Sequence, residues 1–287
     1  MVDIIPKNLI MILLIVIAFI ILFSFLTFFM SIKPGKWPVE FTPESFKLKY
    51  ESVTFESSDG LNLKAWFIPS DKSNNTIIVM HGYPTNKADV LPFSMFLLKK
   101  FNVFLFDFRS FGESEGSYTT VGFKEVNDLD GAVNYLENRK DVKNIGALGF
   151  SLGGSVAIMN KNNDIKAIVS DSAYSNLNNM IESMYKNFYF LKYPFVQLTR
   201  IYGKMFFNVD LKDVSPATAI KNINKPVLII HGKKDSQIPV NEANVLHNAN
   251  KKTELWVVDN ADHGATYALN KVEYEKRVLE FFEKHLK

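Results

Sequence analysis

The stretch "NIGALGFSLGGSVAIM" at residues 144–159 determines the fold class of this chain, because a G-x-S-x-G motif stands there between two structural signals. Its first half, "NIGALGF", is a short apolar run without alternation, as expected of a parallel strand buried on both faces. Its second half, "LGGSVAIM", is predicted to begin a helix. A serine on the sharp turn between such a strand and helix is exposed as a nucleophile. The pattern therefore favours Ser151 as a catalytic nucleophile.

The residues beside Ser151 fit the same interpretation. Gly149 and Gly153 flank it at positions where side chains would collide in so tight a turn. Leu152 begins the helix, so its backbone N–H has no partner within that helix. Such an N–H can bind the negative oxygen that develops during acyl transfer. We expect the Leu152 amide to be one donor of an oxyanion hole.

A second G-x-S-x-G match, "GESEG" at residues 112–116, lacks this context. It is followed by "SYTTVG", which does not predict a helix. Glu113 and Glu115 would also place negative charge beside an oxyanion that needs the opposite sign. We interpret this match as a glycine-rich loop after the strand "NVFLFDF", with Ser114 in a structural role.

A serine nucleophile needs a base, and the chain has five histidines. His247 and His285 lie in helical segments, where a solvated side chain is expected, and His81 and His231 end predicted strands. His263 lies in the loop "DNADHGATY" after the last strand. In an open α/β sheet the site is at the carboxyl ends of the strands. These positions make His263 the predicted base.

The acid that orients the base is expected on a neighbouring loop. Asp235, in "HGKKDSQIP", follows the penultimate strand and precedes His263 by 28 residues. Asp259 and Asp262 are alternatives, but they share the loop of His263, and a short loop rarely lets such a residue reach Nδ1. We predict the order Ser151, Asp235, His263 for a catalytic triad.

The rest of the chain after residue 46 alternates between strand and helix signals, and no internal repeat is present. Two strands around Asp59-Gly60 predict a hairpin. Repeated strand–helix units then predict a mostly parallel eight-stranded sheet with helices on both faces. The predicted strands are 50–57, 61–68, 76–80, 102–108, 144–150, 165–170, 226–232 and 253–259. The predicted helices are 87–99, 122–139, 152–161, 240–250 and 268–286.

Residues 8–32 contain no charged residue and predict a membrane-spanning helix. The 24 residues from Leu9 to Ile32 would extend about 36 Å, enough for a hydrocarbon core of about 30 Å. A cleaved signal peptide is the alternative, but its apolar region is normally shorter and is followed by small residues. Lysines on both sides leave the orientation open. We expect an anchor at 1–32, a linker at 33–45, and a catalytic part that is soluble without the anchor.

Composition limits the remaining possibilities. The 287 residues are 47% hydrophobic and 22% charged, which is ordinary for a globular protein. A net charge of +3, without a long basic run, does not suggest nucleic-acid binding. The chain has no cysteine, which excludes disulfides, thiolate metal sites and cysteine nucleophiles.

From residue 46 to residue 287 the chain resembles the α/β-hydrolase superfamily, including its prolyl-oligopeptidase-like serine hydrolases. The motifs that carry this resemblance are "HGYP" (81–84), "GFSLGG" (149–154), "GKKDSQIP" (232–239) and "ADHG" (261–264), in that order. The resemblance implies that the Tyr83 amide is the second oxyanion donor and that His81 organises its loop. It implies no metal and no organic cofactor. One departure is Asp262, where the family often has glycine.

An insertion at about 172–215 separates the sixth and seventh strands. Its segment 184–207 is rich in Phe and Tyr and carries Lys186, Lys192, Arg200 and Lys204 without an acidic residue. By resemblance, an insertion here forms a helical cap above the serine. One possibility is helices packed on the sheet edge. The other is a cap whose apolar side lines an acyl pocket and whose basic side faces anionic lipid.

The sequence therefore predicts a membrane-anchored serine hydrolase of carboxylic esters or thioesters, acting on a small-molecule or lipid-derived acyl substrate. A serine peptidase of prolyl-oligopeptidase-like type is an alternative. An inactive hydrolase fold that serves as a membrane scaffold is another. The sequence does not specify the substrate, the oligomeric state or the side of the membrane.

Overall fold

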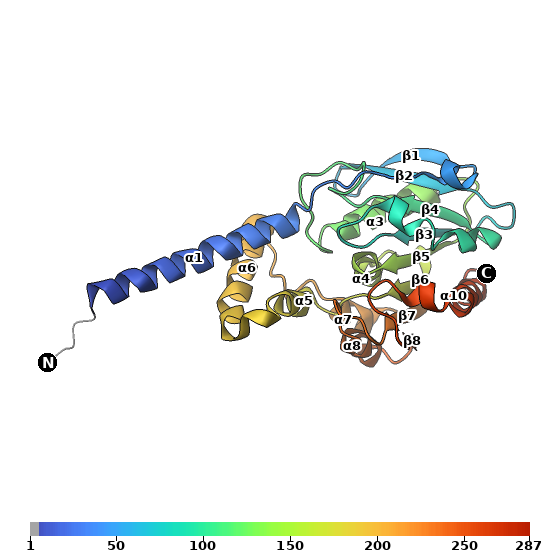
Figure 1. Ribbon diagram of the computed structural model, residues 1–287. Helices are drawn as coiled ribbons and strands as arrows, with labels where there is room; N and C mark the ends of the chain where they lie inside the picture. The colour runs from blue at the N-terminus through green and yellow to red at the C-terminus, as the bar shows by residue number, and fades with distance from the viewer. Residues whose placement is uncertain (1–5) are drawn as a thin grey trace.

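A computed structural model of the chain describes residues 6–287, so residues 1–5 of the predicted anchor lie outside the described part. Its centre is one eight-stranded sheet with the strand order β1-β2-β4-β3-β5-β6-β7-β8 (Figure 1). The hairpin strands β1 and β2 are antiparallel to their neighbours, and the other six strands are parallel. The strands are β1 (Glu51–Glu56), β2 (Asn62–Ile68), β3 (Thr76–Met80), β4 (Asn102–Phe106), β5 (Ile145–Phe150), β6 (Ile165–Asp171), β7 (Val227–Gly232) and β8 (Glu254–Val258). All eight predicted strands are present.

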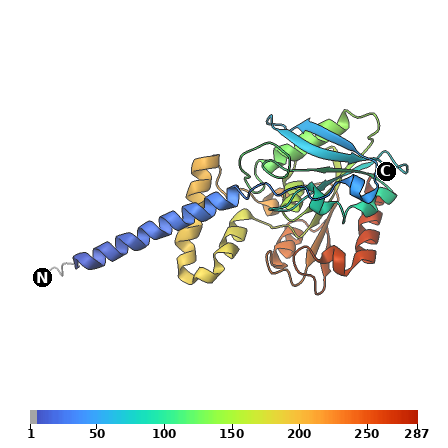
Figure 2. The ribbon, with the colours of Figure 1, turned by 45° about the horizontal axis from the view of Figure 1, so that its top comes forward.

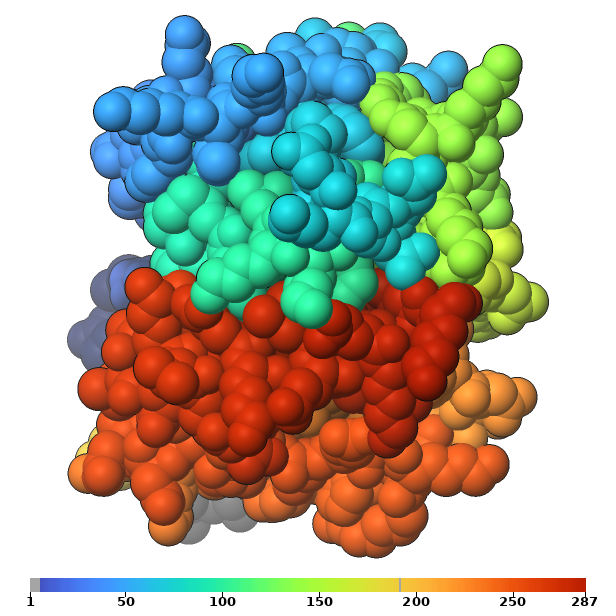
Figure 3. Space-filling model, turned by 90° about the vertical axis from the view of Figure 1, so that its right-hand side faces the viewer, coloured from blue at the N-terminus to red at the C-terminus, as the bar shows by residue number. Residues whose placement is uncertain are grey.

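Helices cover both faces of this sheet. One face packs against α3 (Glu125–Glu137), α4 (Leu152–Met159) and α8 (Asn241–Ala249). The other face packs against α2 (Lys87–Val90), the 3₁₀ helix η2 (Met95–Lys99) and α10 (Lys271–His285). Figure 3 views the molecule from the end opposite α1, where the C-terminal residues in red form a band below the chain that follows β2. The remaining short helices are η1 (Pro43–Phe46), α7 (Pro216–Ala219), η4 (Ile220–Asn222) and α9 (Thr266–Leu269).

Two predicted helices are interrupted. The segment 87–99 divides into α2 and η2, because Pro92 has no N–H for the bond to Ala88 and its ring blocks a continuous helix. The segment 268–286 divides at Asn270, whose φ of −134° and ψ of 41° are not helical. The core contacts of both segments survive the breaks, since Ala88, Leu97 and the apolar residues of α10 are buried in one cluster.

The insertion after β6 forms a helical cap beyond the carboxyl end of the parallel strands. It consists of α5 (Leu177–Met184), the 3₁₀ helix η3 (Lys186–Leu191) and α6 (Lys192–Phe207). Its own apolar cluster includes Tyr174, Ile181, Phe195 and Leu211. The cap is therefore a small packed unit and not a pair of helices added to the edge of the sheet.

The N-terminal helix α1 (Lys7–Ile32) has 26 residues and a mean hydropathy of 3.4 over its best 18-residue window. It is long and apolar enough to cross a membrane, and only 6% of that window is buried within the protein. Its C-terminal half crosses α6 of the cap, as Figure 2 shows. Phe28 and Ile32 are buried there together with Tyr202. This contact was not expected from the sequence, which treated the helix as a separate tether.

Candidate active site

Ser151 occupies the sharp turn between β5 and α4. Its φ of 52° and ψ of −110° are unusual for a residue with a side chain, and such strain occurs at functional sites. The turn is held by the Ser151 N–H, which donates to the Asp171 carbonyl at 2.8 Å. A Cβ at Gly149 would lie 2.2 Å from the Gly153 carbonyl carbon, and one at Gly153 would lie 2.6 Å from the Met80 oxygen. The backbone crossing at this turn therefore requires both glycines.

His263 and Asp235 lie beside this serine. His263 Nε2 is 3.2 Å from Ser151 Oγ, and His263 Nδ1 is 2.7 Å from Asp235 Oδ2. The Asp235 side chain is completely buried and the His263 side chain is 9% exposed. If Nδ1–H donates to Asp235, Nε2 has a free lone pair toward the hydroxyl. The three predicted residues thus form a continuous hydrogen-bonded chain, with the serine at its open end.

The loops that carry Asp235 and His263 are joined by Asp262. Its Oδ1 accepts hydrogen bonds from the Ser236 N–H at 2.8 Å, the Ser236 hydroxyl at 2.9 Å and the His263 N–H at 2.7 Å. The bonds from the Ser236 and His263 amides lower the pKa of Asp262. The Asp235 Oδ1 atom accepts from the Gln237 and Ile238 N–H groups, which fixes that carboxylate. Asp262 therefore ties the two loops together and does not contact the imidazole ring as an acid partner.

The other candidates have different surroundings. Asp259 is exposed and pairs with Lys233 at 2.9 Å. His247 Nδ1 is 2.9 Å from the Thr253 hydroxyl. The His285 ring packs on the Phe281 ring, with centroids 4.9 Å apart. None of the three lies in the chain of contacts at Ser151.

His81 is fully buried and holds the loop that follows β3. The Phe108 N–H donates to His81 Nε2 at 3.1 Å, so Nδ1 carries the hydrogen that is donated to the Gly82 carbonyl at 2.7 Å. Burial lowers the pKa of His81, which keeps the ring in this neutral form. This is the organising position that the sequence suggested for His81.

The Tyr83 loop passes directly beside the serine, since a Cβ at Gly82 would be 3.2 Å from Ser151 Cβ. Within residues 6–287, the backbone N–H groups of Tyr83 and Leu152 donate to no protein acceptor. A buried N–H group without an acceptor costs free energy. Beside a nucleophile, such a group is free to donate a hydrogen bond to an oxyanion. The Tyr83 ring packs edge-on against Phe111, and burial raises the pKa of its hydroxyl.

The loop that contains the second G-x-S-x-G match surrounds a buried carboxylate. Asp107 Oδ2 accepts from Lys87 Nζ at 2.6 Å and from the Glu113 N–H at 2.9 Å. Gly112 has a φ of +46°, and a Cβ there would lie 2.3 Å from the same carboxylate. Ser114 is buried, and its hydroxyl donates to the Asp107 carbonyl at 2.7 Å. The motif in this loop is therefore explained by packing around Asp107.

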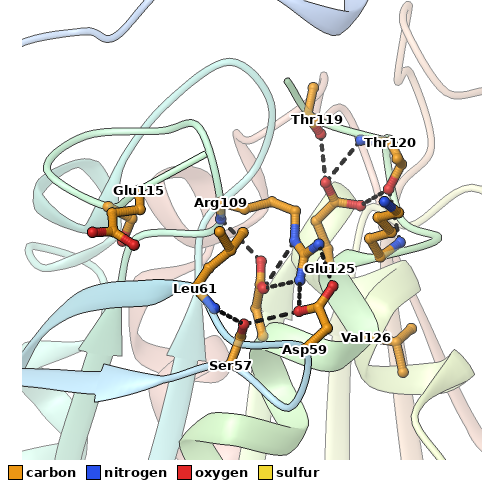
Figure 4. Close-up of polar contacts among 12 residues, drawn as sticks. Ser57, Asp59, Leu61, Arg109, Glu115, Thr119, Thr120, Glu125 and Val126 are labelled. Carbon is orange, nitrogen blue, oxygen red and sulfur yellow. Dashed lines mark hydrogen bonds and ion pairs between the residues drawn. The ribbon is translucent and has the colours of Figure 1, made fainter. Parts of the chain in front are cut away.

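A cluster of charged side chains lies beside this loop, and its members Arg109, Asp128 and Glu125 are buried (Figure 4). Arg109 donates to both oxygens of Asp59, at 2.6 and 2.9 Å, and to Asp128 at 2.6 Å. Glu125 accepts from the hydroxyls of Thr119 and Thr120, at 2.7 Å each. The contacts of Glu125 hold residues 119–122 in place.

Asp171 is a structural contributor that the sequence analysis missed. It ends β6, and its Oδ2 accepts from the Thr266 hydroxyl at 2.6 Å, while its carbonyl binds the Ser151 N–H. Burial raises the pKa of its carboxyl group. Asp171 thereby connects the serine turn to the segment after His263. An acidic residue at the end of the apolar run "IKAIVSD" was the available signal.

The cap lies over this group of residues. Met180 of α5 lines one pocket together with Tyr83, and a second pocket together with Gln237 and Ile238 beside Asp235. Residues of α5 therefore lie beside both the Tyr83 loop and the Asp235 loop. Within residues 6–287 no cluster of three or more His, Asp or Glu side chains is arranged to hold a metal ion.

Comparison with known proteins identifies the family. The family model described as the prolyl oligopeptidase family matches residues 114–287, which is more than half of the chain. The chain belongs to the prolyl oligopeptidase family. This family member is 28% identical to YqkD of Bacillus subtilis over 249 residues, covering 84% of this chain and 82% of YqkD. It is 27% identical over 286 residues to WAV2 of Arabidopsis thaliana, an alpha/beta hydrolase domain-containing protein, covering 94% and 90%.

A solved structure of an esterase from Pyrococcus furiosus is also similar to this prolyl oligopeptidase family member. The two structures superpose with a TM-score of 0.75 and 31% sequence identity, over 90% of this chain and 99% of the esterase. The α/β-hydrolase fold, expected from the sequence, is thus confirmed. The chain is a hydrolase of the esterase and peptidase type, and an apolar helix precedes its hydrolase domain.

Proposed function

We propose that this chain is a membrane-anchored serine hydrolase that cleaves carboxylic esters or thioesters through an acyl-enzyme. The observation that carries the proposal is the contact chain from Ser151 Oγ to His263 Nε2 and from His263 Nδ1 to Asp235 Oδ2. A nucleophile, a base and an orienting acid in hydrogen-bonding reach are what acyl transfer to serine requires.

In the first half-reaction Ser151 Oγ attacks the carbonyl carbon while His263 Nε2 takes the hydroxyl proton. Asp235 holds the Nδ1–H tautomer and stabilises the imidazolium that forms. The Leu152 and Tyr83 amides donate to the negative oxygen of the tetrahedral intermediate. The intermediate then collapses: the bond to the alcohol or thiol breaks, and His263 returns the proton to that leaving group.

In the second half-reaction water takes the place of the alcohol. His263 removes a proton from the water as it attacks the acyl carbon, and the same amides bind the oxyanion. Collapse releases the carboxylic acid and restores the Ser151 hydroxyl with the proton held by His263.

α1 supports the membrane part of the proposal. Fourteen large apolar residues from Leu9 to Leu26 are more than one-third exposed, which is unfavourable in water but suits a hydrocarbon environment. We expect the unmodified chain to stay with membranes after a wash with alkaline carbonate. Release by that wash would indicate a cleaved signal sequence or peripheral attachment.

The nucleophile is tested by labelling with a fluorophosphonate, whose fluoride leaves as a serine hydroxyl attacks phosphorus. Ser151→Ala should abolish labelling of the full chain in detergent. Ser114→Ala is the matched control, because Ser114 occupies the other G-x-S-x-G motif, and it should retain labelling. Persistent labelling of the Ser151 variant would refute the assignment, and absent labelling of the unmodified chain would favour the inactive scaffold.

A peptidase is the second candidate, and it is favoured by the match to the prolyl oligopeptidase family model. The chemistry at Ser151 would be the same, with an amine as the leaving group. A panel of acyl esters, thioesters and peptide amides with equal acyl groups separates the two. Higher kcat/KM for the esters supports the esterase, and higher kcat/KM for the amides supports the peptidase.

A further inference from the structure

An apolar pocket lies between the cap, α1 and the Tyr83 loop. Phe28 and Ile32 of α1 form one wall, Leu177 and Met180 of α5 form another, and Tyr83 closes the end nearest the domain. Among the residues that the structure describes, no charged side chain lines this pocket. Its lining is therefore suited to hydrocarbon and not to a polar or ionic ligand.

The α1 wall is fixed to the cap by hydrogen bonds as well as by packing. The Thr27 and Tyr185 hydroxyls are 2.7 Å apart, and the Tyr202 hydroxyl donates to the Ile21 carbonyl at 3.1 Å. The Phe28 ring packs against the Tyr202 ring, with centroids 5.6 Å apart. α1 is thus a structural part of the pocket and not only a tether that lies nearby.

The inner end of the pocket is next to the proposed nucleophile. Tyr83 lines the pocket, and its neighbour Gly82 is so close to the serine that an added Cβ would be 3.2 Å from Ser151 Cβ. Val121 also lines the pocket, in the segment that Glu125 holds. An acyl chain in the pocket would therefore reach Tyr83, the residue whose amide is the proposed oxyanion donor.

The geometry of α1 places the cap at the edge of the hydrocarbon. The cluster of the cap begins to contact α1 at Ile20, so residues 7–19 project beyond it. These 13 residues extend about 20 Å, whereas a hydrocarbon core is about 30 Å thick. If α1 spans the bilayer, the cap must enter the hydrocarbon by about 10 Å, which is a normal depth for an interfacial helix.

The outer surface of the cap has the composition that such a depth requires. Tyr189, Phe190 and Met205 are 81%, 76% and 73% exposed. Lys186 and Lys204 are exposed near them, whereas Arg200 is paired with Asp210 at 3.3 Å. Aromatic residues with neighbouring lysines are typical of the interface between hydrocarbon and headgroups.

We propose that this pocket binds the acyl chain of a membrane lipid ester, which enters from the bilayer along α1. The proposal rests on the proposed function and adds the substrate class, a long-chain acyl ester held in the membrane. α1 is then both the anchor and one wall of the substrate site. The ester would be presented to Ser151 without leaving the hydrophobic phase.

The experiment compares two substitutions on the last turns of α1 in the full chain. Ser31 lines the pocket, whereas its neighbour Met30 is 61% exposed and points away from it. Ser31→Trp should fill the α1 side of the pocket, and Met30→Trp is the matched control. The measured quantity is the rate at which Ser151 is labelled by an ethyl or a hexadecyl fluorophosphonate in detergent micelles.

We expect Ser31→Trp to slow labelling by the hexadecyl probe at least about tenfold, the effect of losing burial of about two methylene groups. Labelling by the ethyl probe should be unchanged, which also shows that the variant folds. Met30→Trp should react with both probes like the unmodified chain. Equal labelling of Ser31→Trp and its parent by the hexadecyl probe would overturn the pocket assignment and leave the serine hydrolase intact. If neither probe labels the unmodified chain, the proposed function fails instead.

Entry from the bilayer is tested in nanodiscs that contain a phosphatidylcholine with a diazirine in its acyl chain. Irradiation should cross-link the lipid to Leu177 or Met180 in the unmodified chain, and much less in Ser31→Trp. Cross-links confined to outward residues of α1 such as Leu13 and Leu22 would overturn lipid entry. The Met30→Trp chain should give the same pocket cross-links as its parent.

Discussion

The two oxygens of the Asp235 carboxylate contact different partners. Oδ1 accepts from two backbone N–H groups of its own loop, and Oδ2 is 2.7 Å from His263 Nδ1. A second histidine, His231, places Nε2 3.4 Å from Oδ2 and 2.8 Å from the Ile238 carbonyl. The backbone therefore fixes the Oδ1 atom, and the Oδ2 atom faces His263.

This arrangement predicts the effect of Asp235→Asn. An amide at this position can no longer stabilise the imidazolium and favours the wrong histidine tautomer, so kcat for a short-chain ester should fall by about 10³ to 10⁴. Asp259→Asn is the control, because Asp259 contacts exposed Lys233 and should leave kcat unchanged. Steady-state kinetics in detergent measure both. A loss in the Asp259 variant comparable to that of Asp235→Asn would contradict the triad.

A second prediction at this scale concerns acid stability. Hydrogen bonds from Arg109 lower the pKa of Asp59 from 3.8 to about 2. Because the folded pKa is below the unfolded one, the Asp59 carboxylate stabilises the folded state above pH of about 4. That contribution is lost as the pH falls from about 4 toward 2.

The free energy of unfolding in detergent should therefore fall more steeply between pH 5 and pH 3 for the unmodified chain than for Asp59→Asn. Denaturant titrations at the two pH values measure the difference. The Asp59 side chain is 34% exposed, so solvent screening should keep the effect modest. Parallel curves for the two chains would show that the Arg109–Asp59 contact contributes nothing to acid stability.

At the scale of elements, α2 is attached to the sheet by a buried ion pair. Lys87 Nζ is 2.6 Å from Asp107 Oδ2, and both side chains are completely buried. The Lys87 ammonium also lies 4.7 Å from the centroid of the Trp66 ring. Asp107 in turn fixes the loop 107–116, so this pair connects α2, β4 and that loop.

Lys87→Met should lower the free energy of unfolding by about 3 to 5 kcal/mol, because it leaves the Asp107 carboxylate buried without its cation. Lys99→Met is the matched control. Lys99 pairs with Glu275 at 2.7 Å, but its side chain is 61% exposed, and such pairs contribute about 0 to 1 kcal/mol. Denaturant unfolding in detergent compares the two. Equal losses would mean that the buried pair adds nothing to the helix–sheet connection.

Most of these elements follow from local sequence signals. Each parallel strand is an apolar run, and Ser151, Asp235 and His263 could be chosen because each follows a strand at its carboxyl end. The break of the segment 87–99 also had a local signal in Pro92, which periodicity alone does not register. The position of Asp171 also had a local signal, but the residues that Asp171 and Asp262 contact had none, since these links join loops from distant parts of the chain. Their partners follow from tertiary packing.

At the scale of the whole molecule, the contact between α1 and the cap was the feature that the sequence predicted least. A uniformly apolar helix has no face that distinguishes a protein partner from lipid. In the structure the first half of α1 projects away from the protein, and its second half packs against the cap (Figures 1 and 2). Ser24, completely buried, faces Tyr202 and is one of the few polar groups that distinguish the second half.

This contact changes what is expected of a chain that begins at residue 45. Without α1, the cap loses the cover of Phe28 and Ile32, whose burial contributes about 1.5 to 3 kcal/mol each. Tyr185, Phe195 and Tyr202 would then face solvent on one side. We expect the truncated chain to self-associate or to bind detergent, in contrast to the soluble domain that the sequence suggested.

The truncated chain should nevertheless keep its reaction with a small probe. Ser151, Asp235 and His263 are held by the sheet and its loops, whose contacts do not involve α1. Labelling by ethyl fluorophosphonate should therefore persist, while the hexadecyl probe should lose its advantage because one wall of the apolar pocket is absent. Light scattering after size exclusion, with and without detergent, measures the association. A monodisperse monomer in plain buffer that still prefers the hexadecyl probe would show that α1 is only a tether.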